Sequence, residues 1–165
     1  MIYLLDTNIF VETKKRFAPI HVGLSFWAMI NRLAVDGTIA SIDKVEDEIN
    51  VLGDDLTIWS ASQLPQGFYL NTSTAEVIGH YATIINWANN GIFTQAAKDE
   101  FARNTTADAF LIAMAATDPQ NVKIVTYETS EPLRKNKVKI PDAAASVGVT
   151  CITLVEMMNE IGVTY

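Results

Sequence analysis

The chain has 165 residues, of which 49% are hydrophobic and 19% are charged. A chain of this length buries roughly 70% of its unfolded surface, so it can form a core without staples. We therefore predict one folded domain over residues 1–165, and the composition excludes a disordered or low-complexity chain. The single cysteine, Cys151, excludes a disulfide framework and a zinc site built from cysteines.

The charge balance is acidic, with 12 basic and 19 acidic residues and a net charge of -7. Proteins that hold long stretches of nucleic acid by counterion release are usually basic, so an extended footprint of this kind is disfavoured. A compact acidic site that recruits divalent cations is compatible with this charge, because the bound cation reverses the local field. No basic segment precedes Asp6 and no apolar run is long enough for a membrane span, so we expect a cytoplasmic protein with no membrane partner.

In chain order, short apolar runs alternate with segments of helical periodicity. The apolar runs predict strands at 2–5, 38–42, 122–127, 138–140 and 151–154. Apolar residues that recur at three and four predict helices at about 9–16, 22–33, 43–52, 56–62, 74–88, 94–103 and 107–116, then a helical turn from Pro141 and a terminal helix through Ile161. This alternation favours an α/β domain with a mainly parallel sheet, in which ligands bind beyond the carboxyl ends of the strands.

Two of the predicted helices begin with capping signals. Asp43 and Glu46 have the spacing of a capping box, and Gly53 is placed to end the same helix. Thr105 or Thr106 is placed to cap the apolar helix that begins at residue 107. We therefore expect side-chain caps at both starts.

Four acidic residues follow strands or lie on helices that flank the predicted sheet. Asp6 comes directly after the first strand, and Glu128 comes after the strand at 122–127. Glu48 lies on the helix after the second strand, and Asp108 lies in the first turn of the apolar helix. If the sheet forms as predicted, the four carboxylates converge on one edge, where their repulsion requires protons or cations. Oxygen ligands of this kind suit Mg²⁺ or Mn²⁺, which can activate a bound water or clamp a phosphodiester.

Each acid also has a purely structural interpretation. Asp6 and Asn8 follow a strand, where such side chains form turns by bonding to the local backbone. Asp108 lies where a helix dipole favours negative charge. Glu48 and Glu128 fit solvated surface acids. It is the order of the four motifs, rather than any one of them, that favours the functional interpretation.

Four short segments carry these acids in a recognisable order: an acid after the first strand, an acid on an early helix, an acid that opens a late helix, and Thr-x-acid after the next strand. The segments are Tyr3-Leu4-Leu5-Asp6-Thr7-Asn8, Ser41 with Val45-Glu46-Asp47-Glu48-Ile49, Ala107-Asp108-Ala109-Phe110-Leu111-Ile112-Ala113, and Ile124-Val125-Thr126-Tyr127-Glu128. In these segments the chain resembles the PIN-domain family, and most closely an uncharacterised PIN-like branch of small prokaryotic proteins. The resemblance covers about residues 2–152.

The resemblance implies a three-layer α/β/α sandwich and metal-dependent endoribonuclease activity, with Mg²⁺ or Mn²⁺ as the cofactor and RNA as the substrate. Many small bacterial members of the family resemble toxins of toxin–antitoxin pairs, so an antitoxin protein is an implied partner. The residues carried over as catalytic metal ligands are Asp6, Glu48, Asp108 and Glu128. Because Glu128 stands where many members have Asp, a water-mediated contact fits it as well as a direct one. By the same resemblance, Asn8 and Thr126 would orient the ligands or a metal-bound water, and Asp142 is a further acid near the same edge.

Two clusters of basic residues follow the first and the fourth acid. The residues expected to bind phosphates beside the cleavage site are Lys14, Lys15, Arg16, Arg134, Lys135 and Lys137. On an acidic body such clusters would direct a polyanion to one cleft, although solvated loop charge explains them equally well. Phe10, Phe17, Phe101 and Tyr127 are candidates for stacking on bases or for packing in the core.

Two other classes of function stay open. A phosphatase could use Asp6 as a nucleophile, but such enzymes usually carry a second Asp two residues later, where this chain has Asn8. A non-catalytic PIN-like scaffold would bind protein partners instead, and the hydrophobic composition and the terminal helix with Met157 and Met158 leave room for a homodimer or antitoxin interface.

Overall fold

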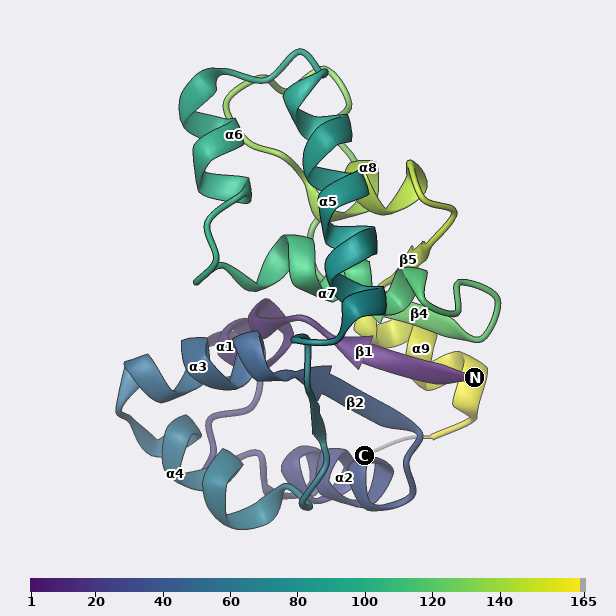
Figure 1. The fold of residues 1–165 in the computed structure, drawn as a ribbon. Helices are drawn as coiled ribbons and strands as arrows, with labels where there is room; N and C mark the ends of the chain where they lie inside the picture. Colours follow the sequence, from purple (N-terminus) through teal and green to yellow (C-terminus); the bar gives the residue numbers. More distant parts are fainter. Residues whose placement is uncertain (164–165) are drawn as a thin grey trace.

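The computed structural model describes residues 1–163 and has a five-stranded sheet at its centre (Figure 1). The strands lie in the order β3-β2-β1-β4-β5, and every neighbouring pair is parallel. They are β1 (Ile2–Leu5), β2 (Ile39–Ile42), β3 (Tyr69–Leu70), β4 (Val122–Val125) and β5 (Thr150–Ile152). The predicted α/β class with a mainly parallel sheet is confirmed.

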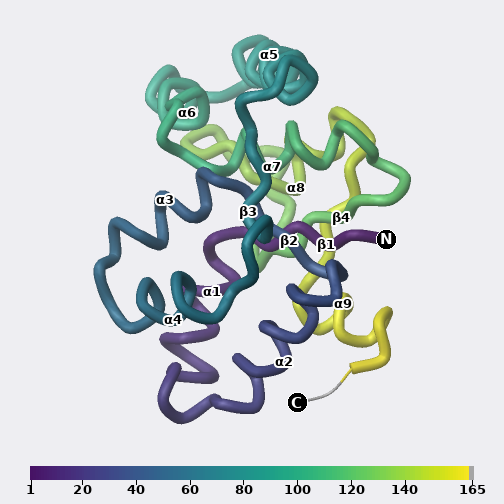
Figure 2. The backbone as a smooth tube through the Cα atoms, turned by 60° about the horizontal axis from the view of Figure 1, so that its bottom comes forward, coloured from purple at the N-terminus to yellow at the C-terminus, as the bar shows by residue number. Residues whose placement is uncertain are grey.

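Helices cover both faces of this sheet. They are α1 (Thr7–Arg16), α2 (Leu24–Val35), α3 (Asp43–Leu52), α4 (Asp55–Gln63), α5 (Ala75–Asn89), α6 (Gln95–Phe101), α7 (Ala107–Ala116), α8 (Ile140–Ala145) and α9 (Leu154–Ile161). The layer of α5 to α8 lies on one side of the sheet, and α2 and α9 lie on the other (Figure 1 and Figure 2). The expected three-layer α/β/α sandwich is thus present.

Helix α7 lies at the centre of the layer formed by α5 to α8. It packs against β2, β4, α5 and α8. Every residue of α7 except Asp108 and Met114 is buried, which explains why its sequence is apolar all round rather than on one face. The strands β1 and β4 beneath it are apolar except for Lys123, and Leu5 and Ile124 are fully buried. Asp108 is therefore a carboxylate carried into the molecule by an otherwise hydrophobic helix.

Two local expectations are wrong, and one short strand was not predicted. Asp43 is the first residue of α3 rather than its cap, because its carboxylate accepts hydrogen bonds from the amide and hydroxyl of Thr72 at 3.2 and 2.7 Å. Segment 138–140 is not a strand, because β5 occupies the free edge of β4 and α8 begins at Ile140. The sequence also gave no sign of β3, whose two residues are too few for a periodic pattern.

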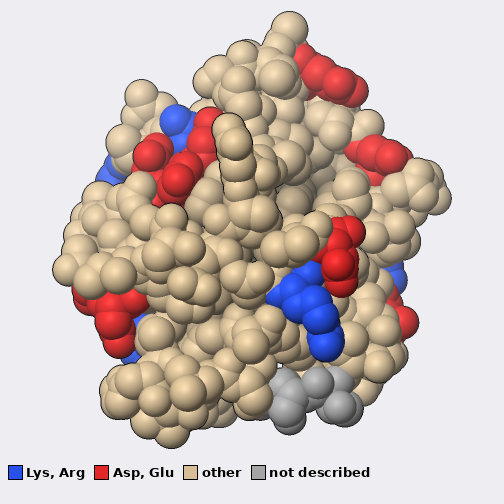
Figure 3. Space-filling view, turned by 90° about the horizontal axis from the view of Figure 1, so that it is seen from below, with Lys and Arg blue, Asp and Glu red and all other residues tan. Residues whose placement is uncertain are grey.

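The side of the molecule formed by α2 and α4 carries few charged residues (Figure 3). A groove of about 600 Å³ lies there, and Leu24, Trp27, Ile58 and Trp59 are among the residues that line it. The rings of Trp27 and Trp59 pack with their centroids 4.7 Å apart at its base. Among the described residues, no helix is both long and apolar enough to cross a membrane.

Candidate functional site

The carboxyl ends of β1 and β4 bring two of the predicted site residues side by side. Leu5 is paired with Val125 at the end of the parallel ladder, so the residues that follow, Asp6 and Thr126, leave the sheet at the same edge. The amide of Asp6 continues the ladder by donating to the Val125 carbonyl at 3.0 Å. Strand pairing alone therefore joins two segments that are 120 residues apart in the chain.

Asp6 is held in one orientation by a small network. The Thr126 hydroxyl donates to Oδ2 of Asp6 at 2.8 Å, and it accepts from Nδ2 of Asn8 at 3.2 Å and from the Glu128 amide at 3.0 Å. Oδ1 of Asn8 in turn accepts from the Tyr127 amide at 3.1 Å. Because two N–H groups occupy the acceptor sites of the hydroxyl, its proton is directed at Asp6. The structure thus places Asn8 and Thr126 beside the acid that they were expected to orient.

Glu48 joins α3 to the start of α7. Its Oε1 accepts from the amide of Ala107 at 3.0 Å, and its Oε2 accepts from the Thr7 hydroxyl. The Ala107 amide is one of the unpaired donors that begin every helix, so a carboxylate there also meets the positive end of the helix dipole. Thr106 is the cap residue of α7, as predicted, but the expected capping bond from its side chain is not formed. The glutamate performs that task from another helix.

Glu128 has an equivalent role at α8. One of its oxygens accepts from Nζ of Lys137 at 2.6 Å, and the other accepts from the amide of Ile140, the first residue of α8, at 2.8 Å. Both glutamates of the site are therefore bound on each oxygen by protein donors. Asp108 differs, because none of the residues 1–163 donates a hydrogen bond to its carboxylate, and Oδ1 of Asp6 is likewise without such a donor.

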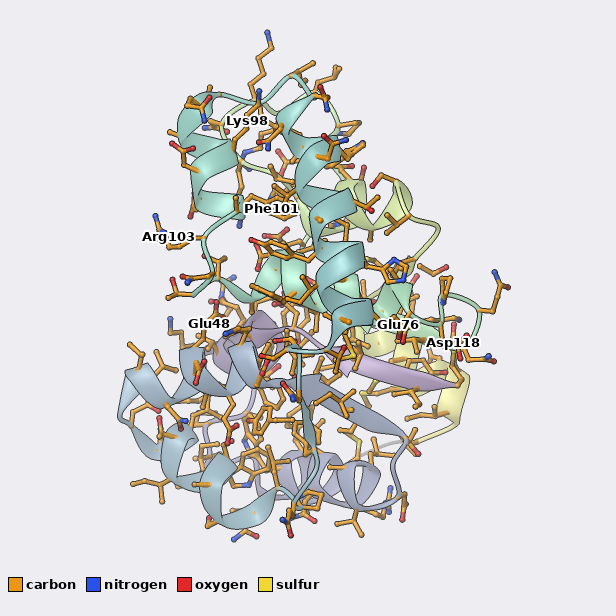
Figure 4. All side chains as sticks on the ribbon, viewed as in Figure 1. Glu48, Glu76, Lys98, Phe101, Arg103 and Asp118 are labelled. Carbon is orange, nitrogen blue, oxygen red and sulfur yellow. The ribbon has the colours of Figure 1, made fainter. Side chains whose placement is uncertain are left out.

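These side chains share one cavity of about 230 Å³. Its lining residues are Asp6, Thr7, Asn8, Val11, Glu12, Glu48, Asp108, Glu128 and Lys137. The four acids that the sequence put in order thus come together, and Glu12 is a fifth that it did not indicate. Figure 4 shows Glu48 on the side of α3 that faces the segment between α6 and α7. Among the lining residues, Lys137 alone is basic.

The electrostatics of the cavity are those of uncompensated carboxylates. Burial raises the pKa of Asp6 to about 8, and repulsion from Asp108, Glu128 and Glu48 adds to this, while the Thr126 hydrogen bond opposes it. Burial likewise raises the pKa of Asp108 to about 7, with repulsion from Glu128 and Glu48, and the nearby charge of Lys137 opposes it. Without a cation, the native fold therefore favours the protonated form of Asp6 at neutral pH and shifts the titration of Asp108 up to neutral pH.

The donor set of the cavity fits a hard divalent cation. It consists of carboxylate oxygens, with no sulfur or imidazole among the lining residues, and Mg²⁺ and Mn²⁺ prefer such ligands. Asp6 and Asp108 have oxygens that are free of protein donors, whereas Glu48 and Glu128 would share theirs with existing hydrogen bonds. Within residues 1–163, no three Asp, Glu, His or Cys side chains stand in a ready-made metal-binding arrangement.

Asp142 lies outside this cavity. Its carboxylate accepts from the Ser130 hydroxyl and from the Glu131 amide at 2.9 Å, so it braces the loop between β4 and α8. The helix-start position made Asp142 a candidate for the same edge, but its contacts are with the loop.

Of the six bases expected to bind phosphates, only Lys137 lines the cavity. Three others are paired with acids of their own chain: Lys14 with Asp54 and Asp55, Arg16 with Glu12, and Arg134 with Glu131. Lys15 and Lys135 are exposed. The structure therefore does not gather the predicted basic clusters at the cavity.

The aromatic candidates divide between the core and the surface. Phe10 and Phe101 are buried, so core packing is their role. Phe17 is 67% exposed, and its ring packs against Tyr127 with the centroids 6.5 Å apart.

Besides Glu12, sequence reasoning missed three contacts of the site: those of the Thr7 hydroxyl and of the Ala107 amide with Glu48, and the pairing of Lys137 with Glu128. The role of Thr7 could have been expected from its position directly after Asp6 in the sequence. The other two connect residues 59 and 9 positions apart through turns that no local pattern specifies.

The fold and the cavity define an α/β/α protein with a carboxylate-lined site at the carboxyl edge of a parallel sheet. The model of a family described as a domain of unknown function, DUF4411, matches residues 3–165, and the chain belongs to that family. Searches of curated proteins and of solved structures found no match to the chain.

Proposed function

We propose that this protein is a PIN-like endoribonuclease that hydrolyses RNA phosphodiesters with Mg²⁺ or Mn²⁺. One observation carries the proposal: acids from four separate parts of the chain share one cavity, and the pKa values of two of them are raised by burial and mutual repulsion. Such an arrangement costs stability unless a cation neutralises it. The chain keeps these acids in a cavity whose lining has a single basic residue.

The chain's own residues would prepare the reaction in three ways. Thr126 keeps Oδ2 of Asp6 occupied and leaves Oδ1 for the cavity. Glu48 fixes the start of α7, and with it the position of Asp108, through the Ala107 amide. Lys137, the basic side chain in the lining, can meet a phosphate oxygen as well as Glu128.

A divalent ion held by Asp6 and Asp108, with Glu48 and Glu128 beside them, would neutralise the carboxylates and lower the pKa of a bound water toward neutrality. The aspartate-nucleophile phosphatase has less support. Asn8 stands two residues after Asp6 in place of a second carboxylate, and its amide is engaged by Thr126 and Tyr127.

The test is cleavage of a fluorescently labelled RNA by the purified protein with Mg²⁺, with Mn²⁺ and with a chelator. We expect metal-dependent cleavage, and a loss of 100-fold or more in Asp6→Asn and Asp108→Asn, on the order of the loss seen when one electrostatic catalytic group is removed. The matched control is Asp36→Asn, which removes an exposed acid at the end of α2. Cleavage that continues in the presence of the chelator would refute the assignment. So would wild-type activity in Asp6→Asn and Asp108→Asn as well as in the control Asp36→Asn.

The toxin role is a further part of the proposal and has its own test. Expression of the chain in a bacterial host should arrest growth, and Asp6→Asn should relieve the arrest. Growth arrest that persists in Asp6→Asn would show that cleavage is not its cause.

A further inference from the structure

A second depression adjoins the cavity, between α3 and the turn that joins α6 to α7. It has a volume of about 730 Å³, and its lining residues are Lys44, Asp47, Glu48, Asn50, Val51, Asn104 and Thr105. We call it the α3 groove. Glu48 lines both the α3 groove and the cavity, so the two spaces meet at this side chain. A substrate bound at the cavity has the groove as its neighbour.

The wall of the α3 groove is built on the same face of α3 that carries Glu48. Lys44 lies four residues before Glu48 and Val51 lies three residues after it, so each is about one helical turn away, roughly 5–6 Å between Cβ atoms. The opposite wall is fixed by the same contact that caps α7, because the bond from Ala107 to Glu48 holds the preceding turn with Asn104 against α3. The groove is therefore a fixed part of the site.

The groove offers the groups that recognise a nucleotide. The amides of Asn50 and Asn104 have both donors and acceptors, and no hydrogen bond within residues 1–163 engages either side chain. Val51 is 87% exposed and presents an apolar surface to a sugar or base. The Lys44 ammonium, which lies 5.4 Å from the centre of the Phe110 ring, supplies a positive charge for a phosphate.

Additional positive charge lies beside the groove. Arg103 directly precedes Asn104 of the groove lining, is exposed and projects outward from the turn after α6 (Figure 4). The volume of the groove is within the range of sites that hold small ligands. A nucleotide next to the bond to be cut therefore suits it in size, polarity and position.

Asp47 adds a preference between bases. A carboxylate only accepts hydrogen bonds, so in the groove it favours a base that presents an exocyclic amino group, as cytosine does at N4. Uracil has a carbonyl oxygen at the same position, which Asp47 would repel. The asparagines adapt to either base, because an amide can present its oxygen or its nitrogen.

From these contacts we propose that the α3 groove binds the RNA nucleotide adjacent to the scissile phosphodiester and that Asp47 makes it favour cytosine over uracil. This inference rests on the proposed nuclease function, since the neighbouring cavity must hold the phosphodiester. It assigns to Asp47 the role of a specificity residue, and to Asn50 and Asn104 that of binding residues, outside the catalytic cavity.

The test measures RNA binding apart from cleavage. In the Asp6→Asn background, fluorescence anisotropy at fixed salt gives the Kd for oligocytidylate and oligouridylate of equal length. We expect tighter binding of oligocytidylate by about 3- to 10-fold, the range for one or two hydrogen bonds. Adding Asp47→Asn should bring the two Kd values together, and adding Asn50→Ala with Asn104→Ala should weaken the binding of both.

The control variant is Asn159→Ala, which removes an exposed asparagine from α9 and should leave both Kd values unchanged. The proposal is overturned if the groove variants bind both oligonucleotides with the same Kd values as the Asp6→Asn protein. It is also overturned if the Asp6→Asn protein binds neither oligonucleotide. A groove-dependent preference without any cleavage by the wild-type protein would instead refute the nuclease function while the groove assignment stands.

Discussion

Replacing Asp6 by asparagine should make the metal-free protein more stable, and the gain should depend on pH. Asp6 is 3% exposed, and its pKa is about 8 in the native protein against 3.8 for the unperturbed group. Between these values the native protein keeps a proton that the unfolded chain has released, so the free energy of unfolding falls as the pH rises from about 4 to 8. Asparagine does not titrate, and its oxygen can still accept from the Thr126 hydroxyl.

The size of the effect follows from the same values. At about 1.4 kcal/mol for each pKa unit, the wild-type penalty at pH 7 is on the order of 4 kcal/mol. Burying the asparagine amide beside Asp108 offsets part of this penalty. We therefore expect the free energy of unfolding of Asp6→Asn to exceed that of the wild type by about 2–4 kcal/mol at pH 7. For a chain of this size, the corresponding rise in Tm is roughly 5–15 °C.

The assay is thermal unfolding in a chelating buffer, followed by circular dichroism at a series of pH values. The difference in Tm between Asp6→Asn and the wild type should be near zero at pH 4 and largest near pH 8. Asp36→Asn, which changes an exposed acid, should show no such trend. A variant that is less stable than the wild type at pH 8, or a gain that is equal at every pH, would contradict the electrostatic reasoning.

Two further predictions follow from the same contacts. Mn²⁺ should raise the Tm of the wild type more at pH 8 than at pH 5, because the ion must displace protons from Asp6 and Asp108 at the lower pH. Equal shifts in Tm at both pH values would count against a site at these residues. So would a Tm shift of the same size in Asp6→Asn. Glu48→Ala should lower the stability by about 1–2 kcal/mol, because the Ala107 amide and the Thr7 hydroxyl lose their acceptor. Glu48→Gln retains an acceptor for Ala107, so in urea unfolding it should lose less than half of the free energy of unfolding that Glu48→Ala loses. If the two variants lose equally much, the capping bond is not the cause.

The order of elements could be predicted because each is encoded locally. The apolar run at 2–5 and the Ala107–Ala116 segment can be buried only inside a layered fold. Asp6 directly follows the first, and Asp108 lies in the first turn of the second. Parallel strands bring their carboxyl ends to one edge, so the sequence alone predicts that Asp6 and Glu128 lie at the same edge.

The sequence by itself therefore determined the α/β class and the four acids that approach one another. Only the tertiary structure decided how each acid is used. It made Glu48 the cap of α7, paired Glu128 with Lys137 and the start of α8, and left Asp6 and Asp108 without an ion-pair partner of their own among residues 1–163. It also paired Lys14 with Asp54 and Asp55, away from the cavity. The physical reason is that periodicity fixes which face of an element is buried, whereas hydrogen bonds and ion pairs between distant residues depend on the positions of turns and side chains, which no local pattern specifies.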